Sequence, residues 1–274
     1  ARASSLNGCV ATFCDGRDRM ASTGYFNLAK ALELALNNGV DRLTGEPLGP
    51  ATGDPRNFAD FDEVMAAFRK QVEHFVALKV RYDDTVRDIY ARHCPVPFTS
   101  AVIDDCIATG TDWHAGGSHY KIATMSGVAV GTVTDALSGI RKHVFTDRRF
   151  SMAELVDALD RNWEGREEVR RVLAHKTPHY GNDDDAVDAL AVQVQEIFCS
   201  AVERHTDIQG AKYWVDLLPT TSHIALGALT GATPDGRRAQ EWLSEGVSPV
   251  QGHDRSGPTA STRSVAKLDH ARTN

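Results

Sequence analysis

The chain has 274 residues, 42% of them hydrophobic and 24% charged, with a formal net charge of −7 and a pI of about 5.9. This composition is typical of a folded globular protein and excludes wholesale disorder. Nucleic-acid binding would need a basic stripe and a membrane span would need about 20 consecutive apolar residues; the sequence shows neither, nor a secretory leader.

The first third of the chain divides into a loop, a helix, a connection and a second helix. Residues 5–20 lack any hydrophobic periodicity and predict a loop. Residues 24–38, rich in Ala and Leu, predict a helix. Three prolines make residues 44–57 a connection. Apolar residues at helical spacing then predict a helix, single or kinked, that follows Asp60 and stops at Pro95.

Helices dominate the rest of the chain, with short strands between them. Helical patterns cover residues 97–109, 132–145, 151–163, 166–175 and 185–204. Strand-like segments cover residues 122–130, 213–218 and 224–229. A helix-rich chain with short buried strands predicts part of a large α/β barrel rather than a small complete domain.

Five cysteines occur, at positions 9, 14, 94, 106 and 199, and none forms a Cys-x-x-Cys pair. An odd, sparse set of this kind predicts free thiols in a cytoplasmic protein rather than disulfides or a zinc clip. Cys106 and Cys199 lie in helical patterns, where a cysteine is expected to be a packing residue. Cys9 differs, because it follows Gly8 in a predicted loop where its thiol is available for chemistry.

Two generic motifs carry little weight. His175 and His179 are spaced four apart, ahead of aspartates at 183–185, but Pro178 disfavours a helix that would bring both rings to one face. The aspartates are expected instead to favour the start of the following helix. The segment 264–267 matches the Ser-x-x-Lys pattern of serine acyl-enzymes without their partner motifs. We therefore predict no metal site and no serine nucleophile.

Many segments resemble one family, in order along nearly the whole chain. Gly8-Cys9-Val10 resembles the cysteine loop of the glycyl radical enzymes, which include pyruvate formate-lyase and the glycerol dehydratase-like enzymes. Similar family segments are Tyr25–Lys30, Leu36–Gly39, Gly49–Pro50, Thr52–Pro55, Gly116–Tyr120, Tyr180–Asp185, Gly231–Arg237, Ser244–Pro249, Gly257–Thr259 and Ser264–Lys267. Residues 23–28, 95–98 and 218–221 resemble most the trans-4-hydroxy-L-proline dehydratase branch.

The resemblance implies a fold and a radical mechanism. The fold is a ten-stranded α/β barrel of two half-barrels, with the cysteine loop inside it. An activating enzyme, using S-adenosylmethionine and an iron–sulfur cluster, installs a radical on a C-terminal glycine. That radical takes the hydrogen atom of Cys9, and the resulting thiyl abstracts hydrogen from a small-molecule substrate. The resemblance also implies that Tyr25 and Thr220 contact the substrate and that the full-length enzyme is a homodimer.

The sequence departs from the family in two ways. It begins without an initiator methionine and stops at Asn274, before the glycine loop. We therefore expect residues 1–274 to be a partial catalytic domain that contains the cysteine loop and the second half-barrel. It would lack the first half-barrel and the glycyl radical domain and be inactive alone. The dehydratase branch also carries Cys-x-Glu, whereas Ala11 stands here in place of the glutamate. Loss of a general acid or base typically costs about 10²–10⁴-fold in rate, and Asp15 or Asp18 could replace it.

Three functional interpretations follow. The first is an anaerobic radical lyase that removes water from trans-4-hydroxy-L-proline or a similar hydroxylated molecule. The second is a glycyl radical enzyme that cleaves a carbon–carbon bond or another bond to carbon. The third is a non-catalytic or truncated paralogue, which would explain the alanine at position 11.

We predict that Cys9→Ser in the full-length protein abolishes turnover without preventing formation of the glycyl radical. A serine O–H bond is too strong to exchange hydrogen with a glycyl radical, so the radical should form and then go unused. Electron paramagnetic resonance would follow the radical, and product analysis would follow turnover. Turnover near the parental rate would refute the assignment of Cys9.

Overall fold

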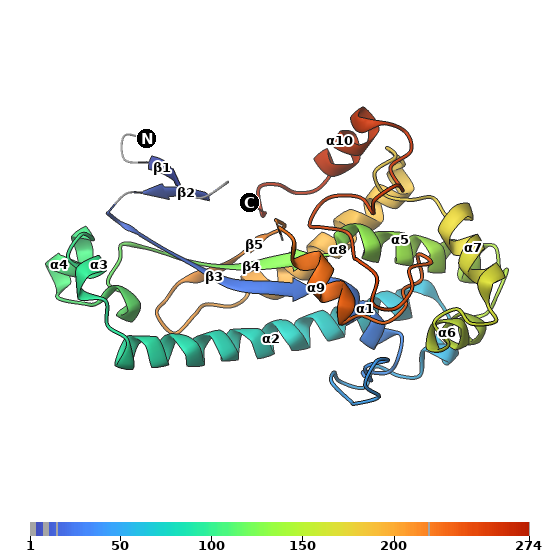
Figure 1. Ribbon diagram of the computed structural model, residues 1–274, viewed down its shortest axis with the longest axis horizontal. Coiled ribbons are helices and arrows are strands. Elements are labelled where there is room, and N and C mark those ends of the chain that lie inside the picture. Colours follow the sequence, from blue (N-terminus) through green and yellow to red (C-terminus); the bar gives the residue numbers. More distant parts are fainter. Residues whose placement is uncertain (1–3, 8–10, 15, 219, 274) are drawn as a thin grey trace. The chain divides into compact units, whose positions relative to one another are not determined.

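The computed structural model describes residues 4–7, 11–14, 16–218 and 220–273 (Figure 1). The strands are β1 (Ser4–Asn7), β2 (Ala11–Cys14), β3 (Asp18–Asn27), β4 (Tyr120–Val128) and β5 (Lys212–Asp216). The α-helices are α1 (Leu28–Ala35), α2 (Phe61–His93), α3 (Pro97–Ser100), α4 (Asp104–Thr109), α5 (Val130–Ile140), α6 (Met152–Asp160), α7 (Glu167–Lys176), α8 (Asp185–Glu203), α9 (Ser222–Ala228) and α10 (Pro258–Ala266). Short 3-10 turns η1 (Pro55–Asn57) and η2 (Trp113–Ala115) and a π-helical turn η3 (Arg141–Thr146) complete the set.

The chain folds as two compact units. Unit 1 comprises residues 1–24, 77–125 and 202–214, and unit 2 comprises residues 25–76, 126–201 and 215–274. In unit 1, β1 and β2 pair antiparallel, with Asn7 opposite Ala11. A buried carboxylate, Asp207, lies 3.2 Å from a guanidinium nitrogen of Arg19 and 3.3 Å from one of Arg87. Because a buried charge is costly without partners, this trio helps to hold unit 1 together.

Unit 2 contains the carboxyl-terminal ends of β3, β4 and β5, which are neighbours in one sheet in that order. Each strand end leads into a helix: β3 runs directly into α1, β4 into α5, and β5 into α9 (Figure 1). Every residue of α5 is buried, as are seven of the eight residues of α1. The Ala- and Leu-rich sequence of α1 therefore packs on nearly all of its faces rather than on a single stripe.

A buried glutamate in α1 connects three segments of unit 2. Glu33, only 2% exposed, pairs with Lys30 at 3.0 Å. Its carboxylate also accepts hydrogen bonds from the backbone N–H groups of Arg42 at 2.9 Å and Gly231 at 2.7 Å. Gly231 follows α9, and a Cβ at that position would lie 3.2 Å from the Glu33 carboxyl carbon. Glu33 thus joins the helix after β3 to the segment that follows α9.

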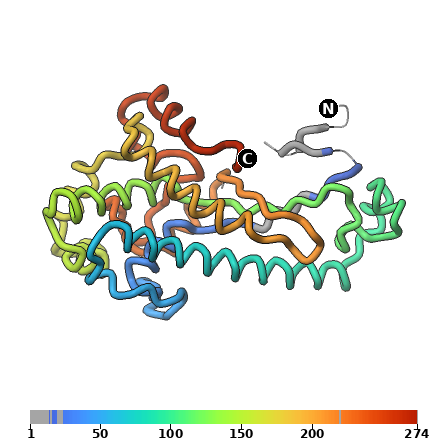
Figure 2. The backbone as a smooth tube through the Cα atoms, turned by 180° about the vertical axis from the view of Figure 1, so that it is seen from behind, coloured from blue at the N-terminus to red at the C-terminus, as the bar shows by residue number. Residues whose placement is uncertain are grey.

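Several expected elements are confirmed. The long helical pattern after Asp60 is α2, which is unbroken in both views of the backbone (Figures 1 and 2). The Asp60 carboxylate accepts a hydrogen bond from the backbone N–H of Glu63 at 3.0 Å. Ser151 and Glu154 form the reciprocal capping box of α6. The carboxylate of Asp184 accepts from the N–H of Ala186 at 2.9 Å, at the start of α8.

Other expectations were wrong. The predicted loop at residues 5–20 contains β1, β2 and the start of β3. Such short strands are held by backbone pairing and need no hydrophobic alternation. The predicted helix at 24–38 begins only at Leu28, because residues 25–27 continue β3 and the Asn27 side chain caps the helix by accepting from Lys30 N–H.

Two further segments differ from prediction. Residues 97–109 form α3 and α4 instead of one helix, because Ile103 between them is extended. The strand-like run at 224–229 belongs to α9, and short apolar runs cannot be assigned by periodicity alone. No helix in the described part of the chain is long and apolar enough to cross a membrane.

We expect the free energy of unfolding to depend strongly on both carboxylate oxygens of Glu33, because each accepts a backbone hydrogen bond. Glu33→Gln would turn an amide NH₂ toward either Arg42 N–H or Gly231 N–H and would leave Lys30 paired with Asp41 alone. We expect a loss of about 3 kcal/mol in the free energy of unfolding. Exposed Glu46→Gln is the matched control and should change it by less than about 0.5 kcal/mol. Equal urea midpoints for the two variants would contradict this role of Glu33.

Candidate functional site

Two pairs of polar side chains lie at or just after the carboxyl-terminal ends of β3, β4 and β5 in unit 2. We call Tyr25, Ser126, Asp216 and Thr220 the strand-end site. Tyr25 Oη lies 3.3 Å from Thr220 Oγ1, although the two residues are far apart in the sequence. Ser126 Oγ donates to Asp216 Oδ1 at 2.5 Å, and the same oxygen accepts from Leu218 N–H at 3.2 Å. In α/β folds the carboxyl ends of strands are the usual place for a ligand.

Thr220 has a strained backbone within this site. Its φ is +51°, a left-handed conformation that a β-branched residue rarely adopts. The Thr220 carbonyl accepts a hydrogen bond from His223 Nδ1 at 3.2 Å, which ties the residue to the first turn of α9. Both Thr220 and Tyr25 are exposed, and Tyr25 retains 46% of its accessible surface. Strain of this kind is often found where a side chain must be aimed at a ligand.

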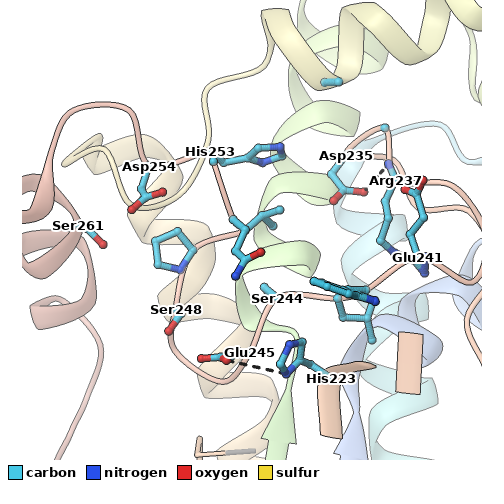
Figure 3. A pocket seen from close by; sticks show the side chains of 18 of the residues that line it. His223, Asp235, Arg237, Glu241, Ser244, Glu245, Ser248, His253, Asp254 and Ser261 are labelled. Atoms are coloured by element: carbon cyan, nitrogen blue, oxygen red, sulfur yellow. Dashed lines mark hydrogen bonds and ion pairs between the residues drawn. The ribbon is translucent and has the colours of Figure 1, made fainter. Parts of the chain in front are cut away.

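A cavity of about 950 Å³ opens beside α9 in unit 2 (Figure 3). Its lining includes His223 and buried Asp235, together with the segment 240–254. His223 therefore contacts both the cavity and the backbone of Thr220. The volume falls at the upper end of the range for small-molecule sites.

The charged groups of the cavity wall are engaged in holding its loop. Burial raises the pKa of Asp235, whose carboxylate accepts from Thr233 Oγ1 at 2.6 Å. Arg237 donates to the carbonyls of Thr230 at 3.2 Å and Gly231 at 2.8 Å. These contacts fix the Pro234-Asp235-Gly236 turn, with Gly236 at φ +91°.

The structure describes only part of the predicted cysteine loop. Cys9 and Asp15 lie outside the described residues, and the side chain of Ala11 is not described. Asp18 is described, and its carboxylate accepts from the backbone N–H of Cys14 at 2.6 Å. Cys106 and Cys199 are buried as expected for packing residues.

The Ser-x-x-Lys pattern is structural. Ser264 is fully buried, and its hydroxyl donates to Asp188 at 3.0 Å while accepting from the N–H of Asp183 at 2.9 Å. Lys267 contacts carboxylates of Asp183, Asp185 and Asp188 at 2.7–3.0 Å. These contacts attach α10 to the start of α8.

Sequence reasoning did not identify Ser126 and Asp216 as members of the strand-end site, and it did not identify the partner of His179. Ser126 and Asp216 lie within predicted strands, where the only signal was a polar residue near a strand end. His179 was weighed with His175, but His175 is exposed, whereas buried His179 lies 3.1 Å from Asp135.

The chain is similar to known proteins over its whole length. Residues 1–227 match the family described as Pyruvate formate lyase-like. The chain is 42% identical to trans-4-hydroxy-L-proline dehydratase of Clostridioides difficile, covering 100% of this chain and 35% of that protein. It is 35% identical to isethionate sulfite-lyase of Oleidesulfovibrio alaskensis, covering 93% of this chain and 31% of that protein. The chain therefore spans about a third of the length of these relatives.

The fold of the chain is also similar to that of a solved structure. Hydroxyproline dehydratase from Clostridioides difficile, with trans-4-hydroxy-L-proline bound, superposes with a TM-score of 0.95 at 42% identity. The match covers 99% of this chain and 34% of that one. It confirms the helix-rich α/β fold that the sequence resemblance implied.

We expect substitutions in the strand-end site to lower kcat/KM without changing the free energy of unfolding. Tyr25→Phe and Thr220→Val each remove one exposed hydroxyl, so each should change the free energy of unfolding by less than about 0.5 kcal/mol. Losing a hydrogen bond to a bound substrate should lower kcat/KM by about 2–10-fold. Tyr82→Phe, at a tyrosine that is 66% exposed on α2, should change neither quantity. Unaltered kcat/KM in Tyr25→Phe would exclude Tyr25 from the site.

Proposed function

The chain belongs to the pyruvate formate lyase-like family, and we propose that the encoded protein is an anaerobic glycyl radical lyase. Its proposed reaction removes water from trans-4-hydroxy-L-proline or a similar hydroxylated small molecule. The observation that carries the proposal is the hydroxyl pair of Tyr25 and Thr220, 3.3 Å apart. Both match the dehydratase branch in sequence, and the substrate-bound relative has the same fold.

The strand-end hydroxyls suit a small polar substrate. Tyr25 Oη and Thr220 Oγ1 can each donate and accept one hydrogen bond, so together they can hold a hydroxyl or a carboxylate in a fixed orientation. The strained backbone of Thr220 and its bond to His223 fix the position of one partner. Correct orientation is worth several kcal/mol in a reaction that must remove one chosen hydrogen atom.

Cys9 is the proposed site of hydrogen-atom exchange. A glycyl radical, installed by a separate activating enzyme, would supply the hydrogen-atom acceptor for the reaction. The other cysteines fit that role less well, because none follows a glycine in the family's Gly-Cys-Val segment. In the described part of the chain, Cys106 and Cys199 are buried, Cys94 is exposed, and Cys14 is half-buried at the end of β2. Cys9 would give up its Sγ hydrogen and then receive one from the substrate. A homodimer is proposed for the full-length protein on the resemblance alone.

Dehydration also needs a group that gives a proton to the departing hydroxyl. Ala11 cannot do so, and Asp18 begins β3, at the opposite end of that strand from Tyr25. We propose Asp216 as the substitute acid, because its carboxyl group lies in the strand-end site. Its Oδ1 accepts hydrogen bonds from Leu218 N–H and Ser126 Oγ, so the proton given to the departing hydroxyl would be carried on Oδ2 in the protonated form of Asp216.

A second candidate reaction rests on the same alanine. A radical lyase whose leaving group departs without a proton would need no glutamate at position 11. Isethionate sulfite-lyase of Oleidesulfovibrio alaskensis, at 35% identity, shows that the family includes an enzyme named for another leaving group.

Ala11→Glu in the activated, encoded protein separates the two reactions. If the site descends from a dehydratase that lost its acid, the variant should form pyrroline carboxylate from trans-4-hydroxy-L-proline faster than the parent, by up to about 10²-fold. If the site serves other chemistry, the added carboxylate would be buried without a partner. The variant would then gain no dehydratase activity and would lose stability.

A parent protein that already dehydrates at full rate would refute the need for glutamate at position 11. In that case Asp216→Asn should lower the rate by at least about 10²-fold. Asp185→Asn is a surface control that should leave the rate unchanged. A fully active Asp216→Asn variant would exclude Asp216 as the substitute acid and would leave Asp15 to be tested.

A further inference from the structure

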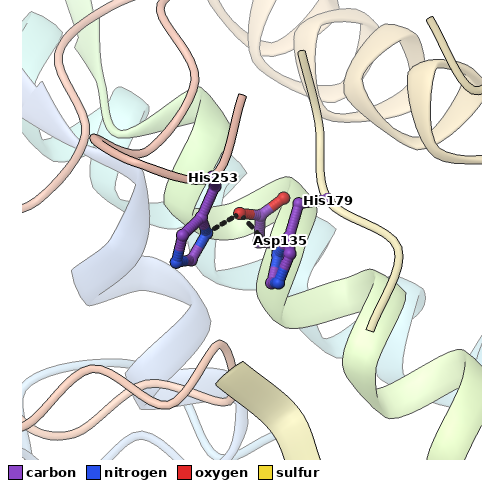
Figure 4. A group of neighbouring side chains, drawn as sticks. All are labelled: Asp135, His179 and His253. Carbon is purple, nitrogen blue, oxygen red and sulfur yellow. Dashed lines mark hydrogen bonds and ion pairs between the residues drawn. The ribbon is translucent and has the colours of Figure 1, made fainter. Parts of the chain in front are cut away.

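Two histidines and one aspartate meet in the interior of unit 2 (Figure 4). Asp135 lies on α5 and is completely buried, with its Oδ2 2.6 Å from His253 Nδ1 and 3.1 Å from His179 Nδ1. The two imidazole rings pack with their centroids 4.0 Å apart. One potential ligand atom from each residue lies within 4.8 Å of the others.

One ring nitrogen of His179 has no hydrogen-bond partner in this cluster. Its Nε2 lies 3.1 Å from the carbonyl oxygen of Ala174, which can only accept, so Nε2 carries a proton. In a neutral ring, Nδ1 is then a bare lone pair facing the Asp135 carboxylate at 3.1 Å. Nδ1 is buried and has no hydrogen-bond partner among the described residues. Either a proton or a metal ion at this point would relieve the repulsion between the lone pair and the carboxylate.

The 3.1 Å spacing of His179 Nδ1 and Asp135 Oδ2 fits two ligands of one metal ion. The 2.6 Å contact of His253 Nδ1 with the same oxygen is a hydrogen bond, which an ion would have to replace. Zinc bonds to imidazole nitrogen and carboxylate oxygen are about 2.0–2.2 Å long. An ion at that distance from both Nδ1 of His179 and Oδ2 of Asp135 would lie to one side of the line that joins them. The ring lone pair would then point at the ion and not at the oxygen, which agrees with the absence of a hydrogen bond at 3.1 Å.

Further hydrogen bonds hold the three candidate ligand residues in place. The side-chain amide of Asn182 donates to the carbonyl of His179 at 3.0 Å and to that of His253 at 2.8 Å, so one group fixes both histidine backbones. The backbone N–H of Tyr180 donates to Asp135 Oδ1 at 2.8 Å. Outer-shell contacts of this kind orient the ligands of metal sites.

We propose that Asp135, His179 and His253 form a binding site for a divalent first-row transition metal of the Zn²⁺ type. Two imidazoles and one carboxylate favour such an ion over Mg²⁺ or Ca²⁺, which prefer oxygen ligands. His253 also lines the cavity of Figure 3, so a fourth coordination position can face that cavity. The ion would join α5, the connection between α7 and α8, and the segment after α9.

The charge of the cluster agrees with a bound cation. The Asp135 carboxylate is completely buried, and its Oδ2 faces Nδ1 of both imidazoles, at 3.1 Å in His179 and 2.6 Å in His253. The same carboxylate that favours a proton on His179 favours a metal ion. The competing occupant is therefore a proton, and the experiment must distinguish the two.

Isothermal titration of the metal-stripped, encoded protein with Zn²⁺ tests the proposal, with Co²⁺ as a spectroscopic probe. The parent should bind one Zn²⁺ at this site and should give a Co²⁺ visible spectrum without thiolate charge transfer. His253→Gln, the least buried ligand change, should weaken Zn²⁺ binding by more than about 100-fold, exceeding the 10–100-fold typical of an outer-shell loss. His175→Gln, at an exposed histidine on α7, is the matched control and should bind as the parent does.

Each other outcome overturns the proposal. A parent that takes up no Zn²⁺ would show that a proton occupies the cluster. Equal Zn²⁺ affinity in His253→Gln and the parent would place the ion elsewhere, on the cysteines for example. Circular dichroism would establish that His253→Gln is folded; if it is not, Asn182→Ala must weaken binding by about 10–100-fold, or the proposal fails.

Discussion

The strand-end site depends on a single buried carboxylate. Glu33 lies on the helix that follows Tyr25 and accepts the N–H of Gly231, in the segment that follows Thr220 and α9. Its pairing with Lys30 compensates the buried charge, and Arg42 N–H occupies another lone pair. Because the elements that carry Tyr25 and Thr220 are joined through one residue, the hydroxyl pair has a fixed geometry rather than two independent positions.

The sequence predicted those elements whose ends carry local signals. α2 follows Asp60 and stops before Pro95, and α6 begins at a complete capping box, so local chemistry set their limits. The boundary between β3 and α1 was missed because an Ala- and Leu-rich run does not show where a buried strand gives way to a helix. The short pair β1 and β2 has no periodicity to detect and exists through its backbone pairing.

Some residues of the candidate sites were predicted from the sequence and others were not. Tyr25 and Thr220 were found through family segments, and the structure brings their hydroxyls together. The cluster of Asp135, His179 and His253 could not be predicted, because its members come from three distant segments and only tertiary packing unites them. Pro178 correctly argued against pairing His179 with His175, yet the actual partners of His179 left no mark in the local sequence.

We propose that the full-length protein carries out radical dehydration in spite of Ala11. To test this, the protein is activated under strict anaerobiosis and incubated with trans-4-hydroxy-L-proline, and both the glycyl radical and pyrroline carboxylate are quantified. We expect pyrroline carboxylate to accumulate over many turnovers while the radical signal persists. A full radical signal together with unchanged trans-4-hydroxy-L-proline would contradict it.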